Sequence, residues 1–263
     1  MHRKVMFVLA YDGTDFHGWQ SQPGLRTAQG VFEDAARHVL RHPVQVRGAG
    51  RTDAGVHAAG QVAYVLTDSG IPVDRLRYAI GSRLPKDMSV FSSREVSMRF
   101  VASRSAVSKL YRYRVHASPA RPVGVLQQRY TYHFWHRLDL DRLRAGARHL
   151  VGTHDFAAMA SKGSERQSTV RTVIRCDVYR RYEEVRFDIE GTGFLYNQVR
   201  NMVGTLLEVG RGHWAPERAE EILASGDRKL CGPTAPAMGL CMQWVRYPPG
   251  LLRPDQSDTP PVG

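Results

Sequence analysis

The chain has 263 residues, of which 42% are hydrophobic, so it can form one large domain or two of ordinary size with a packed core. Its formal net charge of +12 and sequence pI of about 10.0 indicate a polyanionic partner, most simply nucleic acid. The three cysteines lack Cys-x-x-Cys spacing and no apolar run approaches about 20 residues, which argues against a disulfide framework or a membrane span and favours the cytoplasm.

Hydrophobic patterns predict the elements of the first half in chain order. Val5–Ala10 is an apolar strand, and Thr27 is placed to cap the helix that follows it. The β-branched run Gln61–Leu66 predicts the next long strand. Pro72 suits the first turn of a second helix, and Met88–Val96 predicts the strand that ends this half.

The second half repeats this order. In Lys109–His116, tyrosine and valine alternate with arginine and histidine, which predicts a half-buried strand with a basic second face. Asp139 is placed to cap a helix that Gly152 ends. The remaining predicted elements are a hairpin of Thr172–Val178 and Glu184–Ile189, helices over about 196–209 and from Pro216, and a last strand, Leu240–Tyr247.

These elements amount to two diverged copies of a β-α-β-β-α-β plan, which defines an α+β fold. We expect an N-terminal half at 1–104, a C-terminal half at 105–247 and a disordered tail at 248–263, which is rich in Pro, Asp and Ser. Two such halves joined edge to edge would form a central, mostly antiparallel sheet. A cleft between them would be a common place for a ligand.

The most informative string is Gly50-Arg51-Thr52-Asp53-Ala54-Gly55-Val56-His57-Ala58. It places one aspartate on a glycine-flanked turn between two segments of strand character, Gln45–Ala49 and the run from Gln61. Catalytic groups are often found on such loops because the scaffold holds them. Taken alone, the pattern favours a simpler interpretation, in which Asp53 bonds the turn backbone near Gly55.

Several segments together resemble the tRNA pseudouridine synthase A family, in family order and over roughly residues 4 to 247. One segment departs from the family pattern: in Phe100–Ala106, Ser103 stands where the family has an arginine, and Arg104 follows it. The matching segments are Tyr11–Thr14 with Gly18–Gln22, the Asp53 string, Lys109–Tyr113 and Val199–Gly204, with weaker matches at Gly152–Phe156 and Thr169–Thr172.

The resemblance implies that Asp53 is the essential carboxylate, lying in the cleft between the halves, and that Arg200 lies against it. Desolvation in a cleft would raise the pKa of an aspartate, and a nearby guanidinium would oppose that effect. The resemblance also assigns Tyr111 to stacking on the target uridine, because a base that leaves its stack needs a flat partner. Arg51 would contact RNA. Leu195, beside Phe194, is a candidate to close the pocket, although an apolar residue after Gly193 is more often part of the core. Tyr113 is assigned to packing.

Four basic residues form a candidate RNA-facing patch, although such charged runs are often simply solvated. They are Arg104, Lys109, Arg112 and Arg114. The family resemblance implies a homodimer that isomerises uridines 38 to 40 in the anticodon stem-loop of tRNA without metal or cofactor. Two alternatives stay open: a catalytically silent RNA-binding module or chaperone, and a metal hydrolase built on His154 and Asp155. Neighbouring histidines do not supply metal-ligand spacing for that pair, which favours a structural role.

Overall fold

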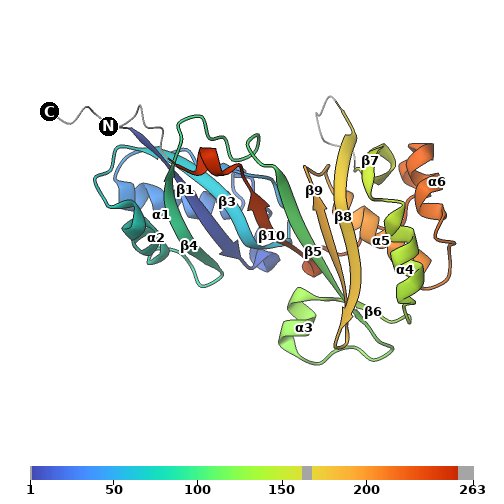
Figure 1. The fold of residues 1–263 in the computed structure, drawn as a ribbon. Helices are drawn as coiled ribbons and strands as arrows, with labels where there is room; N and C mark the ends of the chain where they lie inside the picture. Colours follow the sequence, from blue (N-terminus) through green and yellow to red (C-terminus); the bar gives the residue numbers. More distant parts are fainter. Residues whose placement is uncertain (1, 162–167, 254–263) are drawn as a thin grey trace. The chain divides into compact units, whose positions relative to one another are not determined.

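A computed structural model describes residues 2–161 and 168–253. The chain divides into two compact units: unit 1 comprises Met1–Val107 and Met242–Gly263, and unit 2 comprises Ser108–Cys241. Each unit contains a mostly antiparallel sheet with helices packed on it (Figure 1), so the predicted α+β class is confirmed. The expected C-terminal half ran to residue 247, whereas the residues from Met242 onward group with unit 1.

Unit 1 has the predicted β-α-β-β-α-β order, with β1 between β4 and β3 and antiparallel to both, and with β2 antiparallel to β3. Its second strand, expected over Gln45–Ala49, is reduced to two residues paired with β3. Thr27 caps α1 as expected, since its side chain accepts a hydrogen bond from the Gly30 amide. The elements are β1 Arg3–Tyr11, α1 Ala28–Leu40, β2 Arg47–Gly48, β3 His57–Thr67, α2 Val73–Gly81, β4 Met88–Val96 and β10 Leu240–Arg246, with 3-10 turns Gly13–Asp15 and Pro249–Leu252.

Both faces of the unit 1 sheet are covered. On one face, Phe7 packs edge-on against Phe32 of α1, with ring centroids 5.4 Å apart. On the other, Phe100 lies between Tyr64 and Tyr247, with centroids 5.8 and 4.9 Å away. Leu251 and Leu252 pack against this second cluster. The expectation of a disordered tail from residue 248 is therefore wrong up to Arg253, because apolar side chains anchor the segment; residues 254–263 lie outside the described residues.

Unit 2 has its strands in the order β5-β9-β8-β7, with all of these pairs antiparallel and the short β6 parallel to β5. The hairpin was predicted, and Asp139 caps α4 by accepting from two amides. Three short elements, α3, β6 and β7, were missed, because three to six residues are too few for a period to show. The elements are β5 Ser108–Ala117, α3 Val125–Tyr130, β6 Tyr132–Phe134, α4 Leu140–Arg148, β7 Gly152–Asp155, β8 Val170–Arg181, β9 Glu184–Gly191, α5 Gln198–Gly210 and α6 Arg218–Ser225, with 3-10 turns Ala157–Met159, Arg228–Leu230 and Ala237–Gly239.

The predicted helix over 140–151 ends earlier than expected, at Arg148. Gly152, expected to stop it, instead begins β7 with φ +121°, a conformation that favours glycine. Helix α4 packs on α5 through close contacts in which Gly210 faces Leu143 and Gly146 faces Leu206. Within the ranges described, none of the helices has both the length and the apolar character that crossing a bilayer requires.

Candidate active site

The loop that carries Asp53 joins β2 to β3 in unit 1. The Val56 amide donates to the Asp53 carbonyl at 3.1 Å, which closes a turn around Gly55. Gly55 has φ +78°, a conformation that glycine adopts without strain. Asp53 is half-buried and Arg51 is exposed. The loop thus holds the acid close to the protein body and leaves the arginine in solvent.

A second loop, between β1 and α1, fixes this turn through the main chain. The Trp19 amide donates to the Thr52 carbonyl at 3.0 Å, and the Gly55 amide donates to the Phe16 carbonyl at 3.2 Å. The Tyr11 hydroxyl lies 2.8 Å from the Thr52 hydroxyl. The backbone is therefore bonded on both sides of Asp53, which leaves the acid little positional freedom.

Two glycines of the β1–α1 loop make this approach possible. A Cβ added to Gly13 would lie 2.1 Å from the Val56 carbonyl oxygen, a separation that no side chain can occupy. A Cβ added to Gly18, whose φ is +85°, would lie 2.7 Å from the Thr52 carbonyl oxygen. The glycines of the segments Tyr11–Thr14 and Gly18–Gln22 thus seat the Asp53 turn, a role that the sequence pattern did not reveal.

His57 is a supporting residue that the sequence did not single out. It follows the Asp53 turn at the start of β3, and only 4% of it is exposed. Its Nδ1 accepts a hydrogen bond from the Gly13 amide at 3.0 Å. The same nitrogen lies 3.2 Å from Asp12 Oδ1. His57 therefore anchors Gly13, and through it the contact between the two loops.

In unit 2, Tyr111 and Tyr113 lie on the same face of β5. Tyr111 is 7% exposed, and its ring meets Phe194 edge-to-face with centroids 5.4 Å apart. Tyr113 is fully buried, donates to the Pro236 carbonyl at 2.7 Å, and has a pKa raised well above the ordinary value by burial. The assignment of Tyr113 to packing is confirmed. Leu195, next to Phe194, is also buried, and its amide donates to Gln198 Oε1 at 2.8 Å.

Arg200 lies in the first turn of α5. Its Nε donates to the Ala235 carbonyl at 2.7 Å, and one terminal nitrogen donates to Asn197 Oδ1 at 2.9 Å. Asn197 precedes the helix in the left-handed conformation, with φ +59°. The guanidinium is half-buried and is oriented by groups on both sides. Its direction is therefore set by the local structure.

Asn201, the residue after Arg200, belongs to the interior of unit 2 although its side chain is polar. It is completely buried, and its amide donates to the Met159 carbonyl at 2.8 Å. Its Oδ1 accepts from Arg228 at 3.0 Å and from Thr234 at 2.7 Å. Asn201 thus joins α5 to two neighbouring segments. The helical period could not show this, because polar partners distant in sequence satisfy the amide.

The final glycine of the segment Val199–Gly204 is also explained by close packing. A Cβ on Gly204 would lie 1.7 Å from the Pro233 carbonyl oxygen. The chain from Cys231 to Ala235 therefore crosses α5 in direct backbone contact. The same crossing brings the Ala235 carbonyl to Arg200. Close packing at Gly204 and the orientation of Arg200 are parts of one arrangement.

The four basic residues expected to face RNA have different environments. Arg104 is an exposed residue of unit 1, whereas Lys109, Arg112 and Arg114 belong to β5 in unit 2. Arg112 forms a bidentate pair with Asp188, with both distances 2.7 Å, and this hydrogen bonding raises its pKa. Arg112 is therefore largely neutralised by its own chain. Ser103, at the departure from the family pattern, is exposed.

His154 and Asp155 lie on β7 and bind their own backbone surroundings. His154 Nε2 is 3.0 Å from the Val151 carbonyl, and Asp155 Oδ1 accepts from the Ala157 amide at 2.9 Å. Across residues 2–161 and 168–253, no cluster of three or more His, Cys, Asp or Glu side chains is arranged to hold a metal. These contacts give both residues structural roles.

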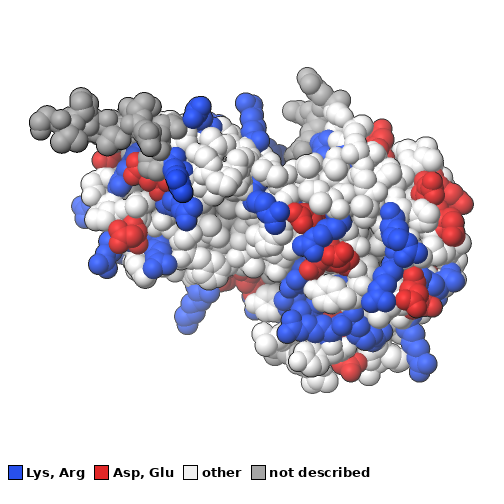
Figure 2. Space-filling model, in the orientation of Figure 1, with Lys and Arg blue, Asp and Glu red and all other residues white. Residues whose placement is uncertain are grey.

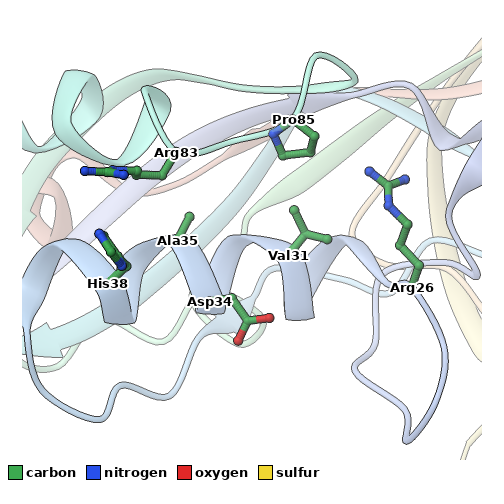
Figure 3. A pocket seen from close by; sticks show the side chains of 7 residues that line it. All are labelled: Arg26, Val31, Asp34, Ala35, His38, Arg83 and Pro85. Atoms are coloured by element: carbon green, nitrogen blue, oxygen red, sulfur yellow. The ribbon is translucent and has the colours of Figure 1, made fainter.

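A shallow pocket of about 430 Å³ lies on unit 1 between α1 and the connection from α2 to β4 (Figure 3). Arg83 and His38 lie near each other at one end, and Asp34 points away from both (Figure 3). Arg26, at the other end, forms a bidentate pair with Asp87 at 2.9 Å. Asp53 does not line this pocket, so it is separate from the turn described above. The lining residues are Arg26, Val31, Asp34, Ala35, His38, Arg83 and Pro85.

Comparison with known proteins identifies the class to which these features belong. A family model described as tRNA pseudouridine synthase matches residues 8–102 and 147–248. A tRNA pseudouridine synthase A from Acetivibrio thermocellus is 44% identical over 93% of this chain and 100% of its own length. Relatives of the same name from Syntrophotalea carbinolica and Halalkalibacterium halodurans are 44% and 40% identical, covering 93% and 99% of this chain and 96% and 98% of their own. The chain belongs to the tRNA pseudouridine synthase family.

Proposed function

We propose that this protein isomerises uridine to pseudouridine in tRNA, at positions 38 to 40 of the anticodon stem-loop. The observation that carries the proposal is the Asp53 turn, whose backbone is bonded on both sides of a half-buried carboxylate. Family membership over most of the chain supports the same reaction. A half-buried acid held on a well-fixed loop suits a catalytic role.

The reaction breaks the bond between N1 of uracil and C1′ of ribose and forms a bond between C5 and C1′. The C5 proton is lost and N1 gains a proton, so atoms balance without redox chemistry or phosphate transfer. Asp53 is the carboxylate of this reaction, and attack at C1′, abstraction of the 2′ proton and addition at C6 are the three roles open to it. Each role requires the ionised form of the acid at neutral pH.

The remaining site residues act on the flipped nucleotide in this proposal. Arg200 favours the ionised form of Asp53, because a guanidinium offsets the cost of desolvating a carboxylate. Tyr111 stacks on the target base, which has left its own stack. Leu195 closes the pocket, and the exposed Arg51 binds the RNA backbone. The oriented guanidinium of Arg200 and the rigid packing of Tyr111 on Phe194 support these roles.

The RNA is bound by a basic surface in this proposal. Arg104, Lys109 and Arg114 contribute positive charge, and Arg112 contributes less because Asp188 pairs with it. The net charge of +12 supports a polyanionic substrate. The protein works as a cytoplasmic homodimer with one tRNA lying across both subunits. Affinity for tRNA should fall steeply with salt, because bound cations are released from the RNA.

The experiment incubates wild-type protein, Asp53→Asn and Asp74→Asn with unmodified tRNA transcript and maps pseudouridine by position. Asp74→Asn is the matched control, because Asp74 is an exposed acid of the same unit. We expect modification at positions 38 to 40 with wild type and Asp74→Asn and none with Asp53→Asn. Binding without any product from wild type would instead indicate a silent RNA-binding module. Pseudouridine formation that persists in excess chelator would exclude the metal hydrolase.

The stacking role is tested by a pair of substitutions at Tyr111. Tyr111→Phe keeps a ring of the same size, whereas Tyr111→Ala removes it. We expect Tyr111→Phe to retain tRNA binding better by about fivefold or more, from the value of one base–aromatic stack. Thermal unfolding of both variants checks that the fold survives. Equal loss of binding in two folded variants would reject stacking.

A further inference from the structure

The sheet of unit 2 has one face that its helices do not cover. Along β5, Tyr111, Tyr113 and Val115 point into the core, so Arg112, Arg114 and His116 point to the other face. Side chains of both charges gather over β5, β8 and β9 on this face (Figure 2). We call it the open face. On β9 the register places Asp188 opposite Arg112, Arg186 opposite Arg114 and Glu184 opposite His116.

Most charges of the open face are paired within it. Arg112 is bidentate to Asp188, and Arg186 lies 2.6 Å from Glu184. Arg175 on β8 lies 2.9 Å from Glu190 and 2.7 Å from Asp177. All these carboxylates already accept from a guanidinium. Within residues 2–161 and 168–253, none of these carboxylates forms an ion pair with Arg114.

Arg114 is the exception in this network. Its Nε is buried and has no hydrogen-bond partner within residues 2–161 and 168–253. The residue directly opposite is Arg186, and like charges across a strand pair repel. His116, two residues further on the same face, also has a buried ring nitrogen, Nδ1, without a partner in the described part of the chain. Buried polar atoms without a partner usually indicate a missing ligand or water.

The edge strand β6 extends this group. His133 pairs in register with His116, and their rings are 6.1 Å apart. Trp135 follows, 6.3 Å from the His133 ring and 61% exposed. An exposed indole near a guanidinium without an ion-pair partner is a combination that suits nucleic acid, in which a phosphate lies next to a sugar and a base.

We propose that Arg114 and His116, with Arg186 beside them, bind a phosphate of the tRNA backbone, and that Trp135 packs on the adjoining nucleotide. The inference rests on the proposed function, since it takes tRNA as the partner. A phosphodiester supplies only acceptors and a negative charge, which matches the guanidinium of Arg114, whose Nε has no partner in the described residues and which forms no ion pair there.

The test measures the affinity of the full-length protein for tRNA transcript over a range of salt concentrations, separately from product formation. Arg148→Gln is the matched control, because Arg148 is an exposed arginine on α4 and the substitution removes the same charge. We expect Arg114→Gln to weaken binding about fivefold to tenfold at low salt and to reduce the slope of log affinity against log salt by about one. We expect Arg148→Gln to leave both within experimental error of wild type.

Trp135→Ala is the second variant, because an exposed side chain can be removed without loss of the fold. It should weaken binding about fivefold or more, with an unchanged salt slope, since stacking releases no cations. Equal slopes for Arg114→Gln and Arg148→Gln, together with unchanged affinity in Trp135→Ala, would overturn the proposal. The oligomeric mass of each variant is measured by sedimentation. If a substitution changes this mass and the change accounts for the lost affinity, the open face is a contact with a second copy and the proposal is overturned.

The two proposals fail separately. If wild type forms no pseudouridine but Arg114→Gln still lowers the salt slope, the proposed reaction is wrong and the phosphate site stands. If wild type modifies its tRNA and Arg114→Gln binds with an unchanged slope, the reaction stands and the phosphate site is rejected.

Discussion

The Asp53 turn of unit 1 and the first turn of α5 in unit 2 hold candidate site residues by different means. The Asp53 turn is fixed by main-chain hydrogen bonds from the β1–α1 loop and by glycines that let two backbones touch. At the start of α5, the side chains of Asn197 and Asn201 make most of the hydrogen bonds that orient the site residue, and Gly204 and Gly232 bring the crossing segment against the helix backbone. The first region depends on the absence of side chains and the second on their chemistry.

This difference decides which substitutions each region tolerates. Main-chain hydrogen bonds survive most side-chain changes, so the Asp53 turn should be sensitive chiefly at its glycines. The α5 turn should be sensitive to truncation of a single amide, because buried donors and acceptors then lose their partners. Four substitutions test this contrast.

The largest effect is expected for Gly13→Ala. The new methyl group would lie 2.1 Å from the Val56 carbonyl oxygen and 2.4 Å from its carbon, so the Asp53 turn must move. We expect pseudouridine formation to fall about 100-fold, the effect of a displacement of about 1 Å at a reacting group. The free energy of unfolding should fall by about 1–3 kcal/mol from overpacking. In the control Gly70→Ala the methyl group meets no atom within 4 Å, and it should change neither.

Asn201→Ala tests the side-chain region. The change removes hydrogen bonds to the Met159 carbonyl, Arg228 and Thr234 and leaves those groups buried without the amide. We expect the free energy of unfolding, measured with urea, to fall by about 2–3 kcal/mol. A loss below about 0.5 kcal/mol would show that water replaces the amide and that side chains do not dominate this region.

Asp188→Asn extends the contrast to the open face. The substitution keeps the shape of the side chain but removes the charge that pairs with Arg112. We expect the free energy of unfolding to fall by about 1–3 kcal/mol. The hydrogen bond to Asp188 raises the pKa of Arg112, and the substitution removes this charged partner of the guanidinium. Affinity for tRNA at low salt should rise, because the face gains unopposed positive charge. Unchanged affinity in a folded variant would show that the RNA does not approach the open face.

The smallest effect is expected for Glu208→Gln near the other end of α5. Burial raises the pKa of Glu208, but hydrogen bonds from Arg211 and His213 outweigh it, and the pKa is lowered overall. A carboxyl group whose pKa is lower in the folded state than in the unfolded state stabilises the fold. This stabilisation is complete above the unfolded-state pKa of about 4.3 and is lost as the pH falls through the folded-state pKa. Glu208→Gln should be about 1 kcal/mol less stable at pH 7 and equal to wild type at low pH. A difference independent of pH would contradict the assignment.

The local sequence determined the long elements and the segments that carry chemistry. The capping roles of Thr27 and Asp139, the hairpin and the strand Met88–Val96 follow from periods and side-chain types within a few residues, and the structure shows all of them. The segments around Asp53, Tyr111 and Arg200 resembled the family whose model and relatives match the chain. Such features can be predicted from the sequence because their physical causes lie within a few residues along the chain.

The tertiary structure decided which polar groups are satisfied and which glycines are obligatory. Asn201 is buried because Thr234, 33 positions away, binds it. Arg112 is neutralised by Asp188, 76 positions away, and Gly13 is required by the Val56 carbonyl on another loop. Residues 248–253, expected to be a tail, pack through Leu251 and Leu252 on an unrelated sheet face. The partners in each case meet only after folding, so no local period or composition contains the information.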